Sequence, residues 1–202
     1  MIDAKTVSEL RAMTGAGIVD CKKALEEAGG DLQAAAELLR KKGIAKAGNK
    51  AARATSEGLV YSYVHGNGKV GAMVEVLCET DFVARTEGFK ELCHDLALQI
   101  VAMNPLYVSK DMVPPEVVEK EKSLSAEEFA GSNKPAEMVA KIVEGKLGKW
   151  YSEVCLMDQA FIKDEDKTVE DVVKEGIAKT GENIQVRRFV RFAMEATTQV
   201  PE

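Results

Sequence analysis

The sequence predicts an α+β fold, in which a bundle of three short helices precedes a core made of a small three-stranded antiparallel sheet with helices on one face. Three observations predict it. Residues 1–43 carry apolar residues at helical spacing, residues 59–78 alternate as a β-hairpin does, and residues 184–194 alternate again after several helical stretches. Because the strands do not alternate one for one with helices, we expect an antiparallel sheet. The length and the change in composition after the three helices indicate two domains, residues 1–54 and residues 55–202.

The second N-terminal helix shows the clearest pattern of the bundle. One apolar stripe runs along it, made of Ile18, Cys21, Leu25 and Ala28. Gly29-Gly30 ends this helix, and Asp31 can N-cap the third, which we expect to end at residues 41–43 before an Ala-rich linker, residues 44–57. So short a unit buries only a small core, which indicates a binding module, and it resembles a ubiquitin-associated (UBA)-like three-helix bundle.

The loop Thr14-Gly15-Ala16-Gly17, between the first two helices, has two interpretations. In the functional one, this loop and the third helix bind a protein partner. In the structural one, Gly15 and Gly17 only permit a tight turn, since glycine adopts positive φ and allows backbones to approach closely. The two interpretations are compatible, and the sequence does not choose between them.

The predicted hairpin contains a motif that is easily misread. Its first strand is LVYSYVH, its turn is Asn67-Gly68 of type I′, and its return strand places on one face Val70, Ala72, Val74, Val76 and Cys78. Residues 66–71 match G-x-G-x-x-G, but a strand follows where a dinucleotide-binding motif requires a helix N-terminus. We therefore expect no nucleotide site on this chain.

A long core-facing helix is predicted next. It carries Phe89, Leu92, Cys93, Leu96, Ile100 and Met103. Asn104-Pro105 ends it, residues 113–122 indicate a surface helix or loop, and Pro135 opens another helix.

The last third of the chain mixes extended and helical patterns. Residues 153–163 look extended, and Thr168 with Asp171 forms a capping-box pattern for a helix that ends near Gly181. The final strand places on one face Ile184, Val186, Val190, Phe192 and Met194.

Composition excludes several functional classes. The net charge of −6 and the pI of about 5.2 argue against broad binding of nucleic acid. We expect all four cysteines to be buried free thiols, because no C-x-x-C pair is present: Cys21, Cys78, Cys93 and Cys155. The two histidines, His65 and His94, lack metal-binding spacing, so we expect no metal site, no cofactor and no enzymatic activity. No membrane span or signal segment is visible, and a cytoplasmic protein is expected.

The segment Thr80-Asp81-Phe82-Val83 stands where a strand ends and a helix begins. Phe82 either packs in its own core or is offered to another molecule. Polar residues flank it on both sides, and the apolar stripe of the following helix begins out of phase at Phe89. Asp81 either caps the following helical turn or pairs with a basic group of a partner.

Three stretches resemble the signatures of the elongation factor Ts family. The first is LRAMTGAG, residues 10–17, which continues through DCKKAL; the second is EVLCETDFVA, residues 75–84; the third is IVEGKL, residues 142–147, followed by Gln159-x-Phe161. The resemblance covers nearly the whole chain, in a compact form without the inserted repeat of longer members. Ala160 stands where the family tends to have proline. No cysteine lies in the last strand, where residue 190 is valine, so a dimer through it is non-covalent.

The resemblance implies a guanine-nucleotide exchange factor of translation elongation. Such a factor binds elongation factor Tu, GDP-bound and nucleotide-free, and promotes GDP release so that GTP can reload. The N-terminal bundle is then expected to contact the GTPase domain of the partner, and the residues singled out for this contact are Arg11, Thr14, Gly15 and Gly17. The segment Thr80–Val83 is expected to insert Phe82 between helices of that domain and to disturb its magnesium and phosphate site. The C-terminal half is expected to contact another domain.

Two other interpretations rest on parts of the chain. The bundle alone suggests a UBA-type protein-binding adaptor, and a weak case for nucleic-acid binding rests on Arg187, Arg188 and Arg191. A three-stranded sheet also leaves exposed edges and an open apolar face, which invites a homodimer through the core sheet.

Overall fold

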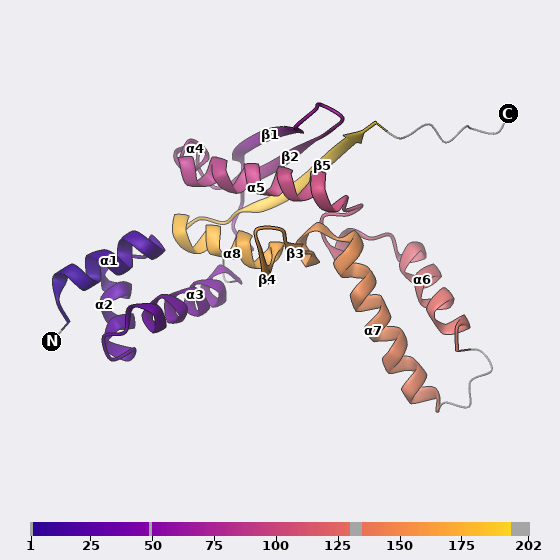
Figure 1. Ribbon diagram of the computed structural model, residues 1–202, viewed down its shortest axis with the longest axis horizontal. Helices are drawn as coiled ribbons and strands as arrows, with labels where there is room; N and C mark the ends of the chain where they lie inside the picture. The colour runs from indigo at the N-terminus through magenta and orange to yellow at the C-terminus, as the bar shows by residue number, and fades with distance from the viewer. Residues whose placement is uncertain (1, 49, 130–134, 195–202) are drawn as a thin grey trace. The chain divides into compact units, whose positions relative to one another are not determined.

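The computed structural model describes residues 2–48, 50–129 and 135–194 and shows an α+β protein. Its first three helices are α1 (Ala4–Thr14), α2 (Ile18–Glu27) and α3 (Leu32–Gly48), and they lie together in Figure 1. The chain forms two compact units. One contains Met1–Tyr61, Glu75–Cys93 and Asp171–Arg187, and the other contains Ser62–Val74, His94–Glu170 and Arg188–Glu202. The domain boundary after residue 54 stays a prediction.

The N-terminal helices bury a small apolar core. Its buried members are Val7, Leu10, Cys21, Ala24, Leu25 and Ala35. The predicted helix signals are confirmed, because Gly29 and Gly30 have φ of 63° and 91° and the Asp31 carboxylate accepts from the backbone of Gln33 at 2.8 Å and of Ala34 at 2.9 Å. The resemblance to a UBA-like bundle stays a prediction.

The third helix is longer than predicted. It ends at Gly48 and not at residues 41–43. A Cβ on Gly43, at the predicted end, would lie 2.7 Å from the Cβ of Ala178. Glycine is therefore present because the backbone approaches another side chain closely, and the Ala-rich residues that follow are good helix formers.

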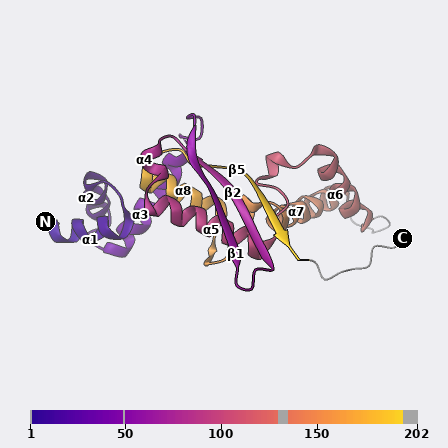
Figure 2. The same cartoon turned by 90° about the horizontal axis from the view of Figure 1, so that it is seen from above.

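The main sheet has three antiparallel strands in the order β1-β2-β5, as Figure 2 shows: β1 (Glu57–His65), β2 (Val70–Cys78) and β5 (Gln185–Ala193). The predicted alternation of β2 is confirmed, since its buried residues are Ala72, Val74, Val76 and Cys78. Tyr63 of β1 meets His94 edge to face, with ring centroids 5.2 Å apart, so helix α5 (Glu87–Met103) packs on this strand. As predicted, α5 ends before Asn104, whose φ is 49°.

The hairpin turn differs from the prediction. The amide of Gly68 donates to the carbonyl of His65 at 2.9 Å, and φ is positive at Gly66 and Gly68 but not at Asn67. A type I′ turn over Asn67-Gly68 requires positive φ at both residues, so that prediction is wrong. The Asn67 side chain instead accepts from the amide of Lys69 at 3.2 Å, which ties the four-residue connection together.

The second half contains a helical hairpin and a small second sheet. Helices α6 (Pro115–Glu127) and α7 (Ala136–Val154) lie side by side in Figure 1. The predicted extended segment at residues 153–163 is mostly wrong, because α7 runs to Val154 and is followed by η2 (Leu156–Asp158) and only then by β3 (Ala160–Phe161). Strand β4 (Asp164–Thr168), which pairs with β3, was missed because its sequence is almost entirely polar. Helix α8 (Val169–Thr180) ends at Gly181 as predicted.

All four cysteines are buried and free, as predicted. Burial raises the pKa of Cys93 to about 12 and that of Cys155 to about 11, and it also raises the pKa of Cys78. These thiols stay protonated near neutral pH and are poor nucleophiles. Among the residues that the structure describes, no helix is long and apolar enough to cross a membrane.

Candidate functional site

The segment Thr80–Val83 forms the start of a one-turn helix, α4 (Asp81–Ala84), directly after β2. Thr80 is its N-cap, since the hydroxyl oxygen of Thr80 accepts from the amide of Val83 at 3.4 Å. Of the two roles considered for Asp81, capping of this turn is therefore excluded. Asp81 is the first helical residue, and its carboxylate pairs with the guanidinium of Arg85 at 2.8 Å, four residues on in the same chain.

Phe82 points away from the protein. Its side chain is 79% exposed, whereas Ala84, two residues later, is only 5% exposed. In one helical turn, these two positions face in opposite directions, so that the packing of Ala84 turns Phe82 outward. The interpretation that Phe82 packs in its own core is therefore wrong. A large aromatic group exposed on a short ordered turn is suited to insertion into another molecule.

Three of the predicted N-terminal site residues, Thr14, Gly15 and Gly17, have structural roles at the ends of α1 and α2. Gly15 is the C-cap of α1 with φ of 68°, and its amide donates to the carbonyl of Arg11 at 2.8 Å. The Thr14 hydroxyl donates to the carbonyl of Leu10 at 2.7 Å, and Gly17 is the N-cap of α2 with an ordinary φ of −63°. The turn therefore requires glycine at Gly15 but not at Gly17. Whether these residues contact a partner stays a prediction.

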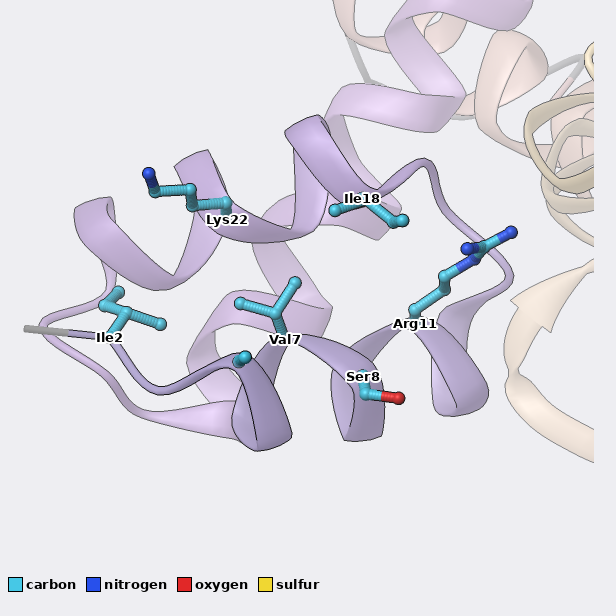
Figure 3. A pocket seen from close by; sticks show the side chains of 7 residues that line it. Ile2, Val7, Ser8, Arg11, Ile18 and Lys22 are labelled. Carbon is cyan, nitrogen blue, oxygen red and sulfur yellow. The ribbon is translucent and has the colours of Figure 1, made fainter.

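Arg11 belongs to a groove between α1 and α2 of about 430 Å³. Its lining residues are Ile2, Ala4, Val7, Ser8, Arg11, Ile18 and Lys22. Figure 3 shows Val7 and Ile18 facing each other across the groove, with Arg11 near one end and Ile2 near the other. The surface thus combines an apolar floor with two cationic side chains.

Sequence reasoning missed the apolar part of this surface. It assigned Ile18 to the core stripe of α2, but Ile18 is 57% exposed and its neighbour Val19 is 65% exposed. Ile18 lies three residues before Cys21, a spacing that fits the core stripe, so the local pattern did not reveal its exposure.

The structure gives both histidines a contact with Tyr63. The Nδ1 of His65 lies 3.0 Å from the Tyr63 hydroxyl, and the ring of His94 meets the Tyr63 ring edge to face. Within the described ranges 2–48, 50–129 and 135–194, no group of three or more histidine, cysteine, aspartate or glutamate side chains is arranged to hold a metal ion.

Comparison with known proteins agrees with the sequence signatures. The family model for Elongation factor TS matches residues 41–176. The chain is 56% identical over 194 residues to Elongation factor Ts of Thermosipho melanesiensis, covering 96% of this chain and 99% of that protein. It is 56% identical over 191 residues to Elongation factor Ts of Thermotoga petrophila, with 95% of each chain covered. It is also 53% identical over 194 residues to that of Carboxydothermus hydrogenoformans, covering 96% of this chain and 89% of the relative.

A family model that spans most of the chain, together with identity above one half over nearly full length, identifies the family. The chain belongs to the elongation factor Ts family of translation elongation factors.

Proposed function

We propose that this chain is the guanine-nucleotide exchange factor for elongation factor Tu and that it releases GDP by inserting Phe82 into the GTPase domain, where it disturbs the magnesium and phosphate site. The observation that carries the proposal is the 79% exposure of Phe82 at the end of a strand, on a turn whose backbone is capped. Family membership supports the exchange role and the choice of partner.

Exchange of this kind requires no catalytic side chain on the factor. A factor that binds the nucleotide-free partner more tightly than the GDP-bound partner weakens GDP binding by the same factor, because the two equilibria are linked. Each tenfold change requires about 1.4 kcal/mol of differential affinity. Burying an exposed phenylalanine contributes about 1.5–3 kcal/mol. Phe82 alone therefore accounts for about one to two powers of ten in GDP release.

The groove of the N-terminal bundle is the second contact in this proposal. Its apolar floor and its cationic residues Arg11 and Lys22 suit a partner helix that presents apolar and acidic side chains. Ile18 belongs to this floor, and the exposed Val19 next to it extends the apolar area beyond the groove. In this arrangement the groove supplies affinity, and Phe82 supplies the disturbance of the nucleotide site.

The test is an exchange assay with elongation factor Tu loaded with fluorescent GDP. The factor should accelerate GDP release, and Phe82→Ala should lower the release rate at saturating factor by about tenfold to a hundredfold, which corresponds to the burial of one phenylalanine. Phe192→Ala is the matched control, because Phe192 is another exposed phenylalanine, 72% exposed on β5. Equal rates of GDP release with the wild-type factor and with Phe82→Ala would contradict the insertion mechanism. Binding without any acceleration of release would remove the exchange function itself.

The exposed face of the hairpin supports the proposed non-covalent homodimer. Val64 of β1 is 64% exposed, and Met73 of β2 is 46% exposed. Met73 alternates with the buried residues of β2 and so points to the opposite face, which leaves exposed apolar side chains on the hairpin. Light scattering should give twice the chain mass at micromolar concentration, and Met73→Glu should shift it toward the monomer. A monomeric wild-type protein under the same conditions contradicts the dimer.

The adaptor interpretation explains less of the molecule. It accounts for the bundle, whereas the similarity to Elongation factor Ts covers 96% of the chain, including the Phe82 turn. Saturable binding of ubiquitin to the full chain would favour the adaptor, and its absence would leave exchange as the function.

A further inference from the structure

Glu182, in the loop between α8 and β5, receives three hydrogen bonds from the residues that follow β2. Its Oε2 accepts from the backbone amide of Glu79 at 3.1 Å and from that of Thr80 at 3.0 Å. Its Oε1 accepts from the hydroxyl of Thr80 at 2.6 Å. Hydrogen bonds to a carboxylate are stronger than those to a neutral acceptor, so the two bonds from Thr80 and the one from Glu79 hold this segment firmly.

The loop that carries Glu182 is anchored by contacts of its own. The carboxylate of Glu79 accepts from the backbone amide of Asn183 at 2.6 Å and from the guanidinium of Arg53 at 3.4 Å. Asn183 is only 1% exposed, and its side-chain amide donates to the carbonyls of Ala51 at 3.3 Å and Arg53 at 2.8 Å. Glu182 therefore accepts hydrogen bonds from Glu79 and Thr80, and Glu79 in turn accepts one from Asn183. We call these contacts among the four residues the glutamate clamp.

The clamp reaches the Phe82 turn through one hydroxyl group. The Thr80 hydroxyl donates to Glu182 and its oxygen accepts from the amide of Val83, which lies within α4. A helix of four residues has no stability of its own, because helix nucleation is unfavourable and only a few bonds offset it. The direction in which α4 presents Phe82 is therefore determined by what holds Thr80.

We propose that Glu182 is the positioning residue for Phe82, a proposal that rests on the insertion mechanism described above. Glu182 acts through Thr80, and it sets the direction of Phe82 before the partner arrives. Without its carboxylate, the amides of Glu79 and Thr80 lose their acceptor, and the N-cap of α4 is no longer tied to the loop that carries Glu182. A misdirected Phe82 still adds apolar area at the surface, but it no longer enters the nucleotide site in the required position.

A double-mutant cycle tests this role in the exchange assay. Glu182→Gln keeps the size of the side chain but replaces one acceptor oxygen with an NH2 group. In the presence of Phe82, it should lower the maximal rate of GDP release about tenfold, because a displacement of about 1 Å in a fitted group loses up to about a hundredfold. In the Phe82→Ala background, the same change should alter the rate by less than about twofold, because the group that it positions is gone. The factor concentration at half-maximal rate should stay unchanged, since the groove of the bundle is intact.

Controls separate positioning from general loss of stability. Glu165→Gln removes the same charge at an exposed position on β4, outside the clamp, and should leave the release rate unchanged. Amide hydrogen exchange at Glu79 and Thr80 should become faster in Glu182→Gln, while that of the buried strand β2 stays slow. If Glu182→Gln does not fold, the cycle is run with Glu182→Asp, which keeps the charge but shortens the reach.

The outcomes are distinguishable. If Glu182→Gln lowers the rate by the same factor in both backgrounds, or does not lower it at all, Glu182 does not position Phe82 and this inference is overturned. If Phe82→Ala itself leaves the rate unchanged, the insertion mechanism fails and the positioning role fails with it.

Discussion

The Phe82 turn and the groove of the N-terminal bundle are both candidate contacts for a partner, but they are built differently. The turn presents one aromatic side chain, and it is held by Glu182, 102 residues away from Thr80 along the chain. The groove presents several apolar and cationic side chains from α1 and α2, which are neighbours in sequence. One surface is small and depends on long-range contacts, and the other is broad and local.

This difference teaches which property each surface contributes to binding. A group that must enter a site on another protein requires a defined direction, because a small displacement loses most of its effect. A docking surface requires area and complementary charge, and it tolerates adjustment of individual side chains. Changes at the turn should therefore affect the maximal rate of GDP release, and changes at the groove should affect the concentration of factor that is needed.

The largest effect that separates the two surfaces is expected at Ile18. Ile18→Glu replaces an apolar side chain of the groove with a carboxylate, and covering that carboxylate with the apolar side chains of a partner is unfavourable. The factor concentration at half-maximal release should rise by about tenfold or more, which corresponds to about 1.4 kcal/mol, while the maximal rate stays the same. A titration of release rate against factor concentration measures both quantities. Leu124→Glu, an exposed leucine on α6, is the control, and a fall in the maximal rate at Ile18→Glu would contradict the division of roles.

A smaller effect should distinguish the two glycines of the N-terminal loop. Gly15→Ala forces a residue with a Cβ to adopt φ of 68°, which destabilises the left-handed conformation by about 1 kcal/mol. Gly17→Ser, at φ of −63°, places a good N-cap residue at the start of α2 and should change the stability by less than about 0.5 kcal/mol. Urea unfolding of the full chain measures both. If Gly17→Ser leaves the stability unchanged but weakens binding to elongation factor Tu, the loop itself is part of the interface.

The smallest effect is expected at Asp81. Its ion pair with Arg85 is exposed and spans one helical turn, so Asp81→Asn should lower the stability by only about 0.3–0.5 kcal/mol. Thermal unfolding of this variant and of Arg85→Gln should give similar small shifts, since both remove one pair. A drop in GDP release beyond about tenfold in Asp81→Asn alone would mean that Asp81 contacts the partner, because the loss of this pair is worth far less than that.

Much of the fold could be predicted because its signals are local. The alternation of β2, the end of α2 at Gly29-Gly30 and the cap at Asp31 each depend on residues within a few positions. The errors had more than one cause. A four-residue connection replaced the type I′ turn, the almost entirely polar sequence of β4 hid that strand, and Gly43 did not mark a helix end because glycine is present there for a close approach to Ala178, more than a hundred residues later in the chain.

In the candidate site, too, some features could be predicted from neighbouring residues and others could not. The polar residues on both sides of Phe82, and its position out of phase with the apolar stripe that begins at Phe89, favoured an exposed side chain. In the structure Phe82 is exposed. Of the two roles left open for Asp81, capping is excluded because Thr80, one position earlier, lies in the extended conformation that an N-cap requires. Nothing near Thr80 in the sequence indicated Glu182, since a carboxylate in a distant loop has no pattern that reveals its partner.

By itself, the sequence determined the family, the α+β class and the buried face of β2, because periodicity and turn chemistry act over a few residues. Only the tertiary structure decided that Gly15 and not Gly17 is left-handed, that Ile18 is exposed in a groove and that Glu182 holds Thr80. The physical reason is that burial and hydrogen bonding between distant segments depend on which surfaces meet after folding, and the local sequence does not encode that pairing.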